Sequence, residues 1–136
     1  GGAGKAAVFK MIYNYLTGRE KEVIDAVKKE GSFRPSSWFP DEVKLAEGYI
    51  SHGVKMGEGW LLTAEIVSLV HEGIENVVCT QPFGCLPNHI VGKGMIRTIK
   101  EKNPNANIVA VDYDPGASAV NQQNRIKLML ANAQKE

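Results

Sequence analysis

The chain has 136 residues, of which 43% are apolar, and this is enough for one modest hydrophobic core. Its 16 basic and 15 acidic side chains leave a net charge of +1, and without a dense Lys/Arg cluster we expect no nucleic-acid partner. No run of about eighteen apolar residues and no signal peptide stand out, so we expect no membrane segment and a cytoplasmic location.

Residues 1–55 predict a helical N-terminal portion that carries an aromatic loop. Apolar residues recur at helical spacing between residues 6 and 30, and the interruption at Gly18 favours two short helices or one broken helix. The following stretch GSFRPSSWFPDE combines turn residues with Phe33, Trp38 and Phe39, which either pin the loop to the core or form an exposed contact surface. The opening GGAGKAAVF lacks an initiator Met, and we expect a piece of a longer protein.

Residues 56–136 predict the α/β class, with parallel strand-loop-helix units. A turn at MGEG precedes the helical pattern WLLTAEIVSLVHEGI, and the buried strand NVVCT follows. The unit recurs as one helix over HIVGKGMIRTIKEK, a second buried strand IVAVD, and a final helix through LMLA. This order is typical of parallel sheets with crossover helices. Since two strands are few for such a sheet, we expect the two portions to be one compact fragment of a larger chain.

Two cysteines and a histidine lie close together in CTQPFGCLPNH. Cys79 closes the first expected strand, Cys85 lies in the loop beyond it between two prolines, and His89 lies near the start of the next helix. Thiolates ligate metals and iron-sulfur clusters, but two sulfurs cannot complete either kind of site. Cys79 therefore also fits a small buried side chain, and His89 fits a hydrogen-bonding residue at a helix start. Cys85 is the stronger candidate ligand, because a stiff loop suits a ligand that must be held in place.

The second strand leads into DYDPGAS, where Asp112 and Asp114 lie at the carboxyl end of the expected sheet. Ligands of open α/β sheets bind at this edge, so the two carboxylates fit a site for a hydroxyl group or a magnesium-bound phosphate. The alternative is a turn that begins at Asp114, with Ser118 as N-cap of the last helix. In that helix Asn121 and Arg125 are four residues apart and share one side.

The segment from about Met56 to Leu130 resembles the C-terminal segment of the large activase-related proteins of the 2-hydroxyacyl-CoA dehydratase system. The motifs that carry the resemblance are QPFGCLPNH and DYDPGASAVNQQNRIKLML, whereas residues 1–55 match only loosely. The resemblance implies a cytosolic protein of anaerobic bacteria that joins an ATP-hydrolysing activase region to a region similar to the dehydratase subunits. Those subunits hold a [4Fe-4S] cluster between flavodoxin-like α/β domains.

The resemblance assigns the cluster-ligand role to Cys85, with Cys79 as a second candidate, and leaves the remaining ligands to other parts of the parent chain. Its implied function is low-potential electron transfer, with a CoA thioester as a candidate substrate. The alternative is a non-catalytic domain that docks on the activase region. The ATP-binding signature of the activase region is not found in this sequence, so we expect no ATP hydrolysis by it. We also expect the fragment to have no enzymatic activity alone. Further candidate loop residues are Phe83, Asn88, His89, Asp112 and Asp114.

Overall fold

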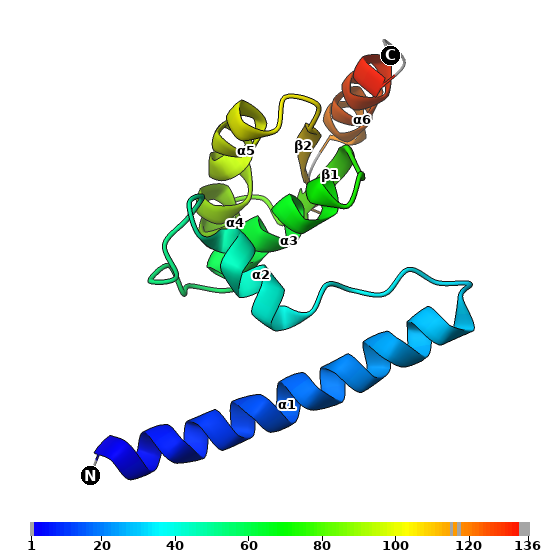
Figure 1. Ribbon diagram of the computed structural model, residues 1–136. Coiled ribbons are helices and arrows are strands. Elements are labelled where there is room, and N and C mark those ends of the chain that lie inside the picture. Colours follow the sequence, from blue (N-terminus) through cyan, green and yellow to red (C-terminus); the bar gives the residue numbers. More distant parts are fainter. Residues whose placement is uncertain (1, 115, 117, 134–136) are drawn as a thin grey trace. The chain divides into compact units, whose positions relative to one another are not determined.

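The computed structural model describes residues 2–114, 116 and 118–133, and the chain divides into two compact units, Gly1–Lys44 and Leu45–Glu136. In the first unit, α1 (Gly2–Glu30) is one continuous helix, drawn in blue in Figure 1. The predicted break at Gly18 is therefore wrong. A single glycine costs a helix only about 1 kcal/mol relative to alanine, and the turns on either side of it contain good helix formers.

The aromatic loop after α1 contacts that helix through two of its three aromatic residues. The indole N–H of Trp38 donates to the Thr17 carbonyl at 3.0 Å, and the ring of Phe39 meets the ring of Tyr13 edge-on at 6.3 Å between centroids. Phe33 is 73% exposed, so it does not anchor the loop. The short helix α2 (Phe39–Ala46) begins at Phe39, the second of the two aromatic residues that contact α1.

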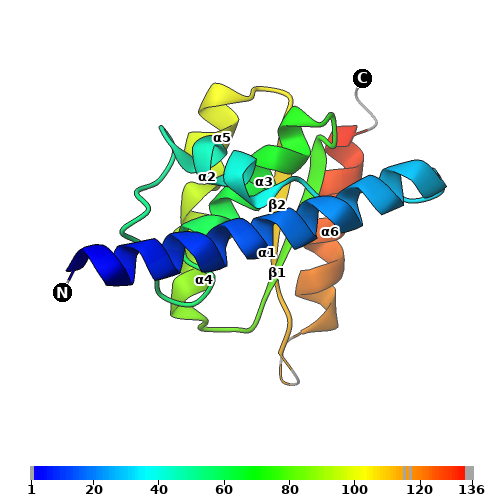
Figure 2. The ribbon, with the colours of Figure 1, turned by 60° about the horizontal axis from the view of Figure 1, so that its bottom comes forward.

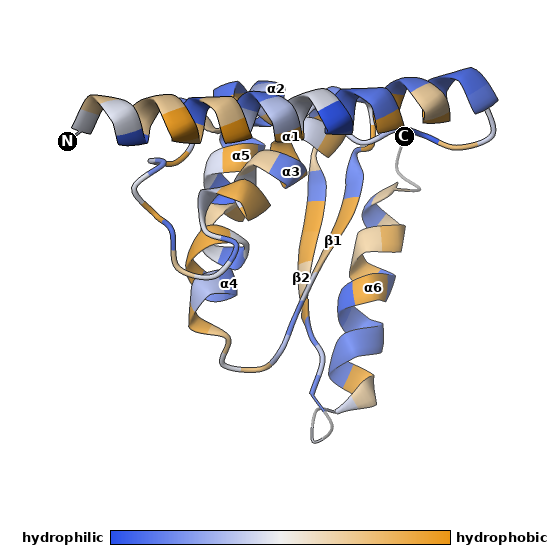
Figure 3. Ribbon diagram, turned by 90° about the horizontal axis from the view of Figure 1, so that it is seen from below, coloured by the Kyte–Doolittle hydropathy of each residue, from blue (hydrophilic) through white to orange (hydrophobic). Residues whose placement is uncertain are grey.

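The second unit confirms the α/β class. Its elements in chain order are α3 (Trp60–His71), β1 (Asn76–Gln81), α4 (Leu86–Val91), the 3-10 helix η1 (Lys93–Met95), α5 (Ile96–Lys102), β2 (Asn107–Asp112) and α6 (Ala119–Ala133). Both predicted strands are present, and they pair in parallel with Asn76 opposite Asn107 and Gln81 opposite Asp112. Helices α3, α4 and α5 lie on one side of the strands and α6 lies on the other (Figures 2 and 3).

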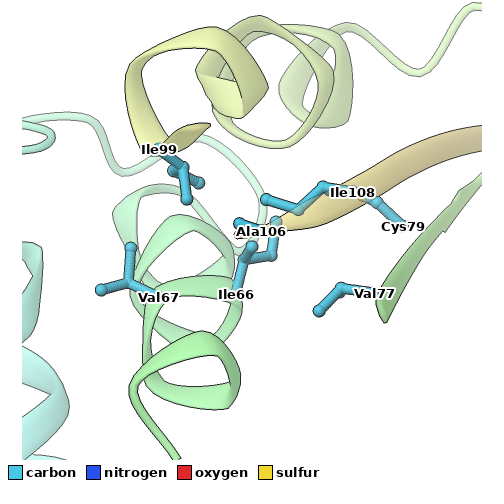
Figure 4. Close-up of a cluster of buried hydrophobic side chains, with 7 residues drawn as sticks. All are labelled: Ile66, Val67, Val77, Cys79, Ile99, Ala106 and Ile108. Carbon is cyan, nitrogen blue, oxygen red and sulfur yellow. The ribbon is translucent and has the colours of Figure 1, made fainter. Parts of the chain in front are cut away.

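The core of this unit lies between the strands and the helices α3 and α5 (Figure 4). Its members come from four segments: Ile66, Val67, Val77, Cys79, Ile99, Ala106 and Ile108. Along β1 buried and exposed residues alternate, and Val78 is 38% exposed, so the predicted buried strand is buried on one face only. The reason is that α6 packs against β2 and leaves the outer face of β1 open.

The predicted single helix between the strands is divided at Gly92. The backbone there leaves the helical conformation, with φ of −98° and ψ of −83°, and α4 ends while η1 begins. A Cβ atom at this position would lie 2.9 Å from the sulfur of Cys79 and 3.2 Å from Leu62. The chain therefore bends where its backbone packs directly on the core, and a residue without a side chain permits that contact.

Helix α3 ends in a glycine turn. Gly73 has φ of 84°, its N–H donates to Val70, and the N–H of Ile74 donates back to Leu69 at 2.9 Å, which together form a Schellman motif. This turn sets the direction in which the chain enters β1. Among the residues that the structure describes, no helix is both long and apolar enough to cross a membrane.

Candidate functional site

The carboxyl ends of β1 and β2 lie side by side, because Gln81 is paired with Asp112 and both strands end there. The loops that follow the two strands therefore start next to each other. A cleft of about 720 Å³ opens at this end of the sheet. Its lining comes from both loops and from the first turns of α6: Phe83, Asp112, Asp114, Gly116, Ser118, Asn121, Gln122, Asn124, Arg125 and Leu128.

The side chains of the cleft are mostly polar and carry charges of both signs. Asp112 and Asp114 supply two carboxylates, and Arg125 supplies the one guanidinium of the described lining. The predicted sharing of a helix side by Asn121 and Arg125 is confirmed, since both face this cleft. Two negative charges against one positive charge favour a cation or a hydroxyl-bearing ligand over an anion.

Helix α6 is tied to β2 by side chains that bond to the strand backbone. Gln122 donates from Nε2 to the Asp112 carbonyl at 3.1 Å, and Arg125 donates from Nη1 to the Ala110 carbonyl at 3.2 Å. The expected turn after the strand is seen in part, because the N–H of Gly116 lies 3.4 Å from a carboxylate oxygen of Asp114. Residues 115 and 117 of that turn lie outside the described residues.

A buried amide connects the two strand ends. The side chain of Gln81 is only 2% exposed, and its Nε2 donates to Oδ1 of Asp112 at 2.6 Å. This bond holds one carboxylate oxygen of Asp112 in a fixed position at the floor of the cleft. The other amide atom, Oε1 of Gln81, is buried without a hydrogen-bond partner among the described residues, which costs on the order of 1–3 kcal/mol.

The imidazole of His89 belongs to the same neighbourhood. Its Nδ1 lies 2.9 Å from the Cys85 carbonyl and 3.4 Å from Nε2 of Gln81. A carbonyl can only accept, so the shorter contact requires a proton on Nδ1. With that proton in place the amide N–H₂ of Gln81 has no acceptor on this nitrogen, which agrees with the short bond that Gln81 makes to Asp112 instead. His89 therefore acts as a hydrogen-bonding residue in the first turns of α4, one of its two predicted roles.

Cys85 ends a tight turn and occupies the N-cap position of α4, without a capping hydrogen bond from its side chain. Its N–H donates to the Pro82 carbonyl at 3.2 Å, and Gly84 between them has φ of 70°, as the third residue of a type II turn requires. The thiol is half-buried and is not in a disulfide. Its neighbours Phe83 and Leu86 are exposed, with 74% of the Phe83 surface open to solvent. The loop thus presents a thiol within an apolar rim.

The two cysteines lie in different environments. Cys79 is in the hydrophobic core beside Val77 and Ile108 (Figure 4), and burial raises the pKa of its thiol. Its sulfur faces the backbone of Gly92, whereas the cleft is lined by other residues. The structure therefore separates the candidate ligand Cys85 from the second candidate, and Cys79 serves the packing of the core.

Within residues 2–114, 116 and 118–133, no group of three or more His, Cys, Asp or Glu side chains gathers as a metal site. Asn88 was also a candidate, and its Oδ1 is a second buried oxygen without a described partner. Sequence reasoning missed Gln81, although the alternation of Val77 and Cys79 toward the core already placed position 81 on the inner face.

Comparison of the chain with protein-family models, with curated proteins and with solved structures found no match.

Proposed function

We propose that this chain is a domain of an activase-related protein of the 2-hydroxyacyl-CoA dehydratase system, in which Cys85 is one ligand of an iron-sulfur cluster. The observation that carries the proposal is the position of that thiol, half-buried at the carboxyl end of the sheet and at the end of a rigid turn. The specific motifs between Met56 and Leu130 support the same assignment. Two parallel strands with helices on both sides are compatible with a flavodoxin-like unit, which is part of the proposal.

The described residues could supply one ligand of a cluster, because one of the two sulfurs, that of Cys85, is accessible. A cluster of this type needs three or four ligands, so the others would come from another part of the parent protein. When bound, the cluster would supply one-electron chemistry at low potential. The contribution of this chain would be to hold the sulfur of Cys85, to orient it through the turn at Gly84, and to exclude water with Phe83 and Leu86.

The test uses the full-length protein that contains this domain, purified without oxygen. Iron and acid-labile sulfide are measured in the wild type, in Cys85→Ser, and in Cys79→Ser as the matched control. We expect Cys85→Ser to lose or destabilise the cluster and Cys79→Ser to retain the wild-type iron content, with reduced stability from the altered core. Wild-type iron in Cys85→Ser, or no iron in the parent, would refute the ligand role.

A second function is favoured by a separate observation on the first unit. Helix α1 exposes a large apolar surface, which includes Phe9, Met11 and Leu16, and of its described residues Thr17 and Ile24 alone are buried. Exposed apolar surface of this extent is typical of a docking site. The alternative function is a non-catalytic domain that docks on the ATP-hydrolysing activase region.

This alternative predicts that Phe9→Ser with Leu16→Ser weakens association with the separately purified activase region, while Cys85→Ser leaves the association unchanged. Light scattering of the mixture measures it. Equal association of all three proteins would exclude α1 as the docking surface.

In the first of these two functions, the candidate substrate is a CoA thioester. The cleft at the strand ends carries more negative than positive charge, so the pyrophosphate and ribose phosphate groups of CoA would find no electrostatic complement there. The cleft instead fits the hydroxyl and amide groups of such a molecule, through Asn121, Asn124 and the two aspartates.

A further inference from the structure

The strand β2 has one paired edge and one open edge in the described structure. The backbone N–H groups of Asn107 and Tyr113 donate to the carbonyls of Glu75 and Gln81, each at 2.7 Å, and so point toward β1. Along a strand the N–H and C=O of one residue point to the same side, and the side alternates from residue to residue. The groups that point away from β1 therefore belong to Ile108, Ala110 and Asp112.

Two of these outward carbonyls already accept hydrogen bonds from side chains of α6. Arg125 donates to the carbonyl of Ala110, and Gln122 donates to the carbonyl of Asp112. Each side chain places a donor where a neighbouring strand would place a backbone N–H. The edge thus has the geometry to continue the ladder, and an added strand would displace these two side chains from the carbonyls.

A groove of about 620 Å³ runs along this edge. Ile108, Val109 and Ala110 all line it. Because consecutive side chains of a strand point to opposite faces, a hollow that reaches all three must follow the edge of the strand and not one face. Its walls are η1 with α5 on one side and Arg125 of α6 on the other, and α5 and α6 lie on opposite sides of β2 in Figure 3.

The rim of the groove is strongly positive. Lys93, Arg97, Lys100 and Arg125 supply four cations, and Glu101 supplies one carboxylate, which is paired with Arg97 at 2.8 Å. Lys93 and Lys100 are exposed, and no described carboxylate forms an ion pair with either. The floor is apolar, through Ile96 and the strand residues. An apolar floor with an open backbone ladder and a cationic rim matches an extended polypeptide with acidic side chains.

We propose that the open edge of β2 binds an extended acidic segment of a partner polypeptide as an added strand. The segment would pair its backbone with Ile108, Ala110 and Asp112, and would lay alternate apolar side chains on the floor of the groove. Its carboxylates would meet Lys93 and Lys100 at the rim. The proposal stands without the iron-sulfur assignment, since it uses neither cysteine.

The experiment titrates the protein with a short synthetic peptide in which valine and glutamate alternate, and follows backbone amide hydrogen exchange by NMR. Strand addition slows exchange at the outward amides, while the amides of Val109 and Val111, which already face β1, change little. This alternation is an internal control, because a ligand that only neutralises the rim cannot protect every second amide. A peptide with lysine in place of glutamate is expected not to bind.

Charge reversal at the rim provides the second measurement. Lys93→Glu with Lys100→Glu is expected to lower the affinity for the acidic peptide about tenfold at low salt. Added salt should also lower the affinity of the wild-type protein for this peptide. The matched control is Lys55→Glu with Lys127→Glu, which makes the same charge change at exposed positions outside the groove.

Unchanged exchange at the outward amides with the peptide in millimolar excess would overturn the proposal. Inorganic pyrophosphate serves as a competing probe for a simple anion site. If pyrophosphate displaces the peptide completely and the peptide protects no alternate amides, the rim binds anions and the edge does not accept a strand.

Discussion

Gln81→Glu would place a second carboxyl group against Asp112 at the point where both strands end. The replaced Nε2 lies 2.6 Å from Oδ1 of Asp112, and the Gln81 side chain is almost wholly buried. An ionised glutamate there would lose its hydration beside a like charge, so we expect the new carboxyl to keep its proton at neutral pH. In that state its O–H would replace the amide as the donor to Asp112.

The cost to stability follows from the difference between the folded and unfolded states. Glutamate ionises in the unfolded chain at about pH 4.3, and each pH unit above that value favours the unfolded state by about 1.36 kcal/mol until the folded-state pKa is reached. Below about pH 4 both states are protonated and the titration adds no cost. With a folded-state pKa above 7, the cost at pH 7 is about 3.7 kcal/mol, a large part of a typical stability of about 5–15 kcal/mol.

The assay is urea unfolding at pH 5 and pH 7, monitored through the fluorescence of Trp60. All proteins carry Trp38→Phe, so the fluorescence signal comes from the second unit alone. Between the two pH values we expect the stability gap between variant and parent to grow by about 2.7 kcal/mol. Gln81→Leu is the control, since it removes the amide without adding a titrating group and should show a constant offset. An equal gap for Gln81→Glu at both pH values would refute the inference that a carboxyl group at position 81 keeps its proton at neutral pH.

Two further predictions concern the hydrogen bond between α3 and the end of α4, and the reactivity of the two thiols. Thr63→Val should lower the free energy of unfolding by about 1–3 kcal/mol, because its Oγ1 donates to the Val91 carbonyl at 2.6 Å in the core and the carbonyl would lose that donor. Thr63→Ser keeps the hydroxyl and should retain that bond but loses a buried methyl group, so the outcome that contradicts the assignment is a Thr63→Val protein with the urea midpoint of the wild type. In the native protein Cys85 should react with an aromatic disulfide reagent faster than Cys79, whose pKa is raised by burial, and Cys85→Ser should remove the fast phase. Equal rates for the two thiols would contradict the separation of their environments.

The sequence allowed the strands and their parallel order to be predicted, because NVVCT and IVAVD are apolar runs bounded by turn residues. The sequence did not show which of two glycines in helical segments would interrupt its helix. Gly18 and Gly92 carry the same local penalty, yet α1 continues through the first and the chain bends at the second. The difference is tertiary, since only Gly92 packs on the sulfur of Cys79.

The same limit applies to the site. Asp112, Asp114 and the shared side of Asn121 and Arg125 were predicted from their place after a strand or along a helix, and all of them line the cleft. The bond from Gln81 to Asp112 depends on the register of two strands that are far apart in the sequence. No local pattern specifies that register, although the alternation along β1 does place Gln81 inside.

The strand β2 separates two hollows of opposite charge, and Arg125 lines both of them. At the end of the strand one guanidinium faces two carboxylates, whereas along its edge four cations face one carboxylate. Anionic partners are therefore drawn to the edge, and cations or hydroxyl groups to the end. An added strand would also need the Ala110 carbonyl that Arg125 now occupies, so its binding would release the guanidinium at the border of the two hollows. Occupation of the edge would in this way alter the charge balance of the cleft that the two loops share.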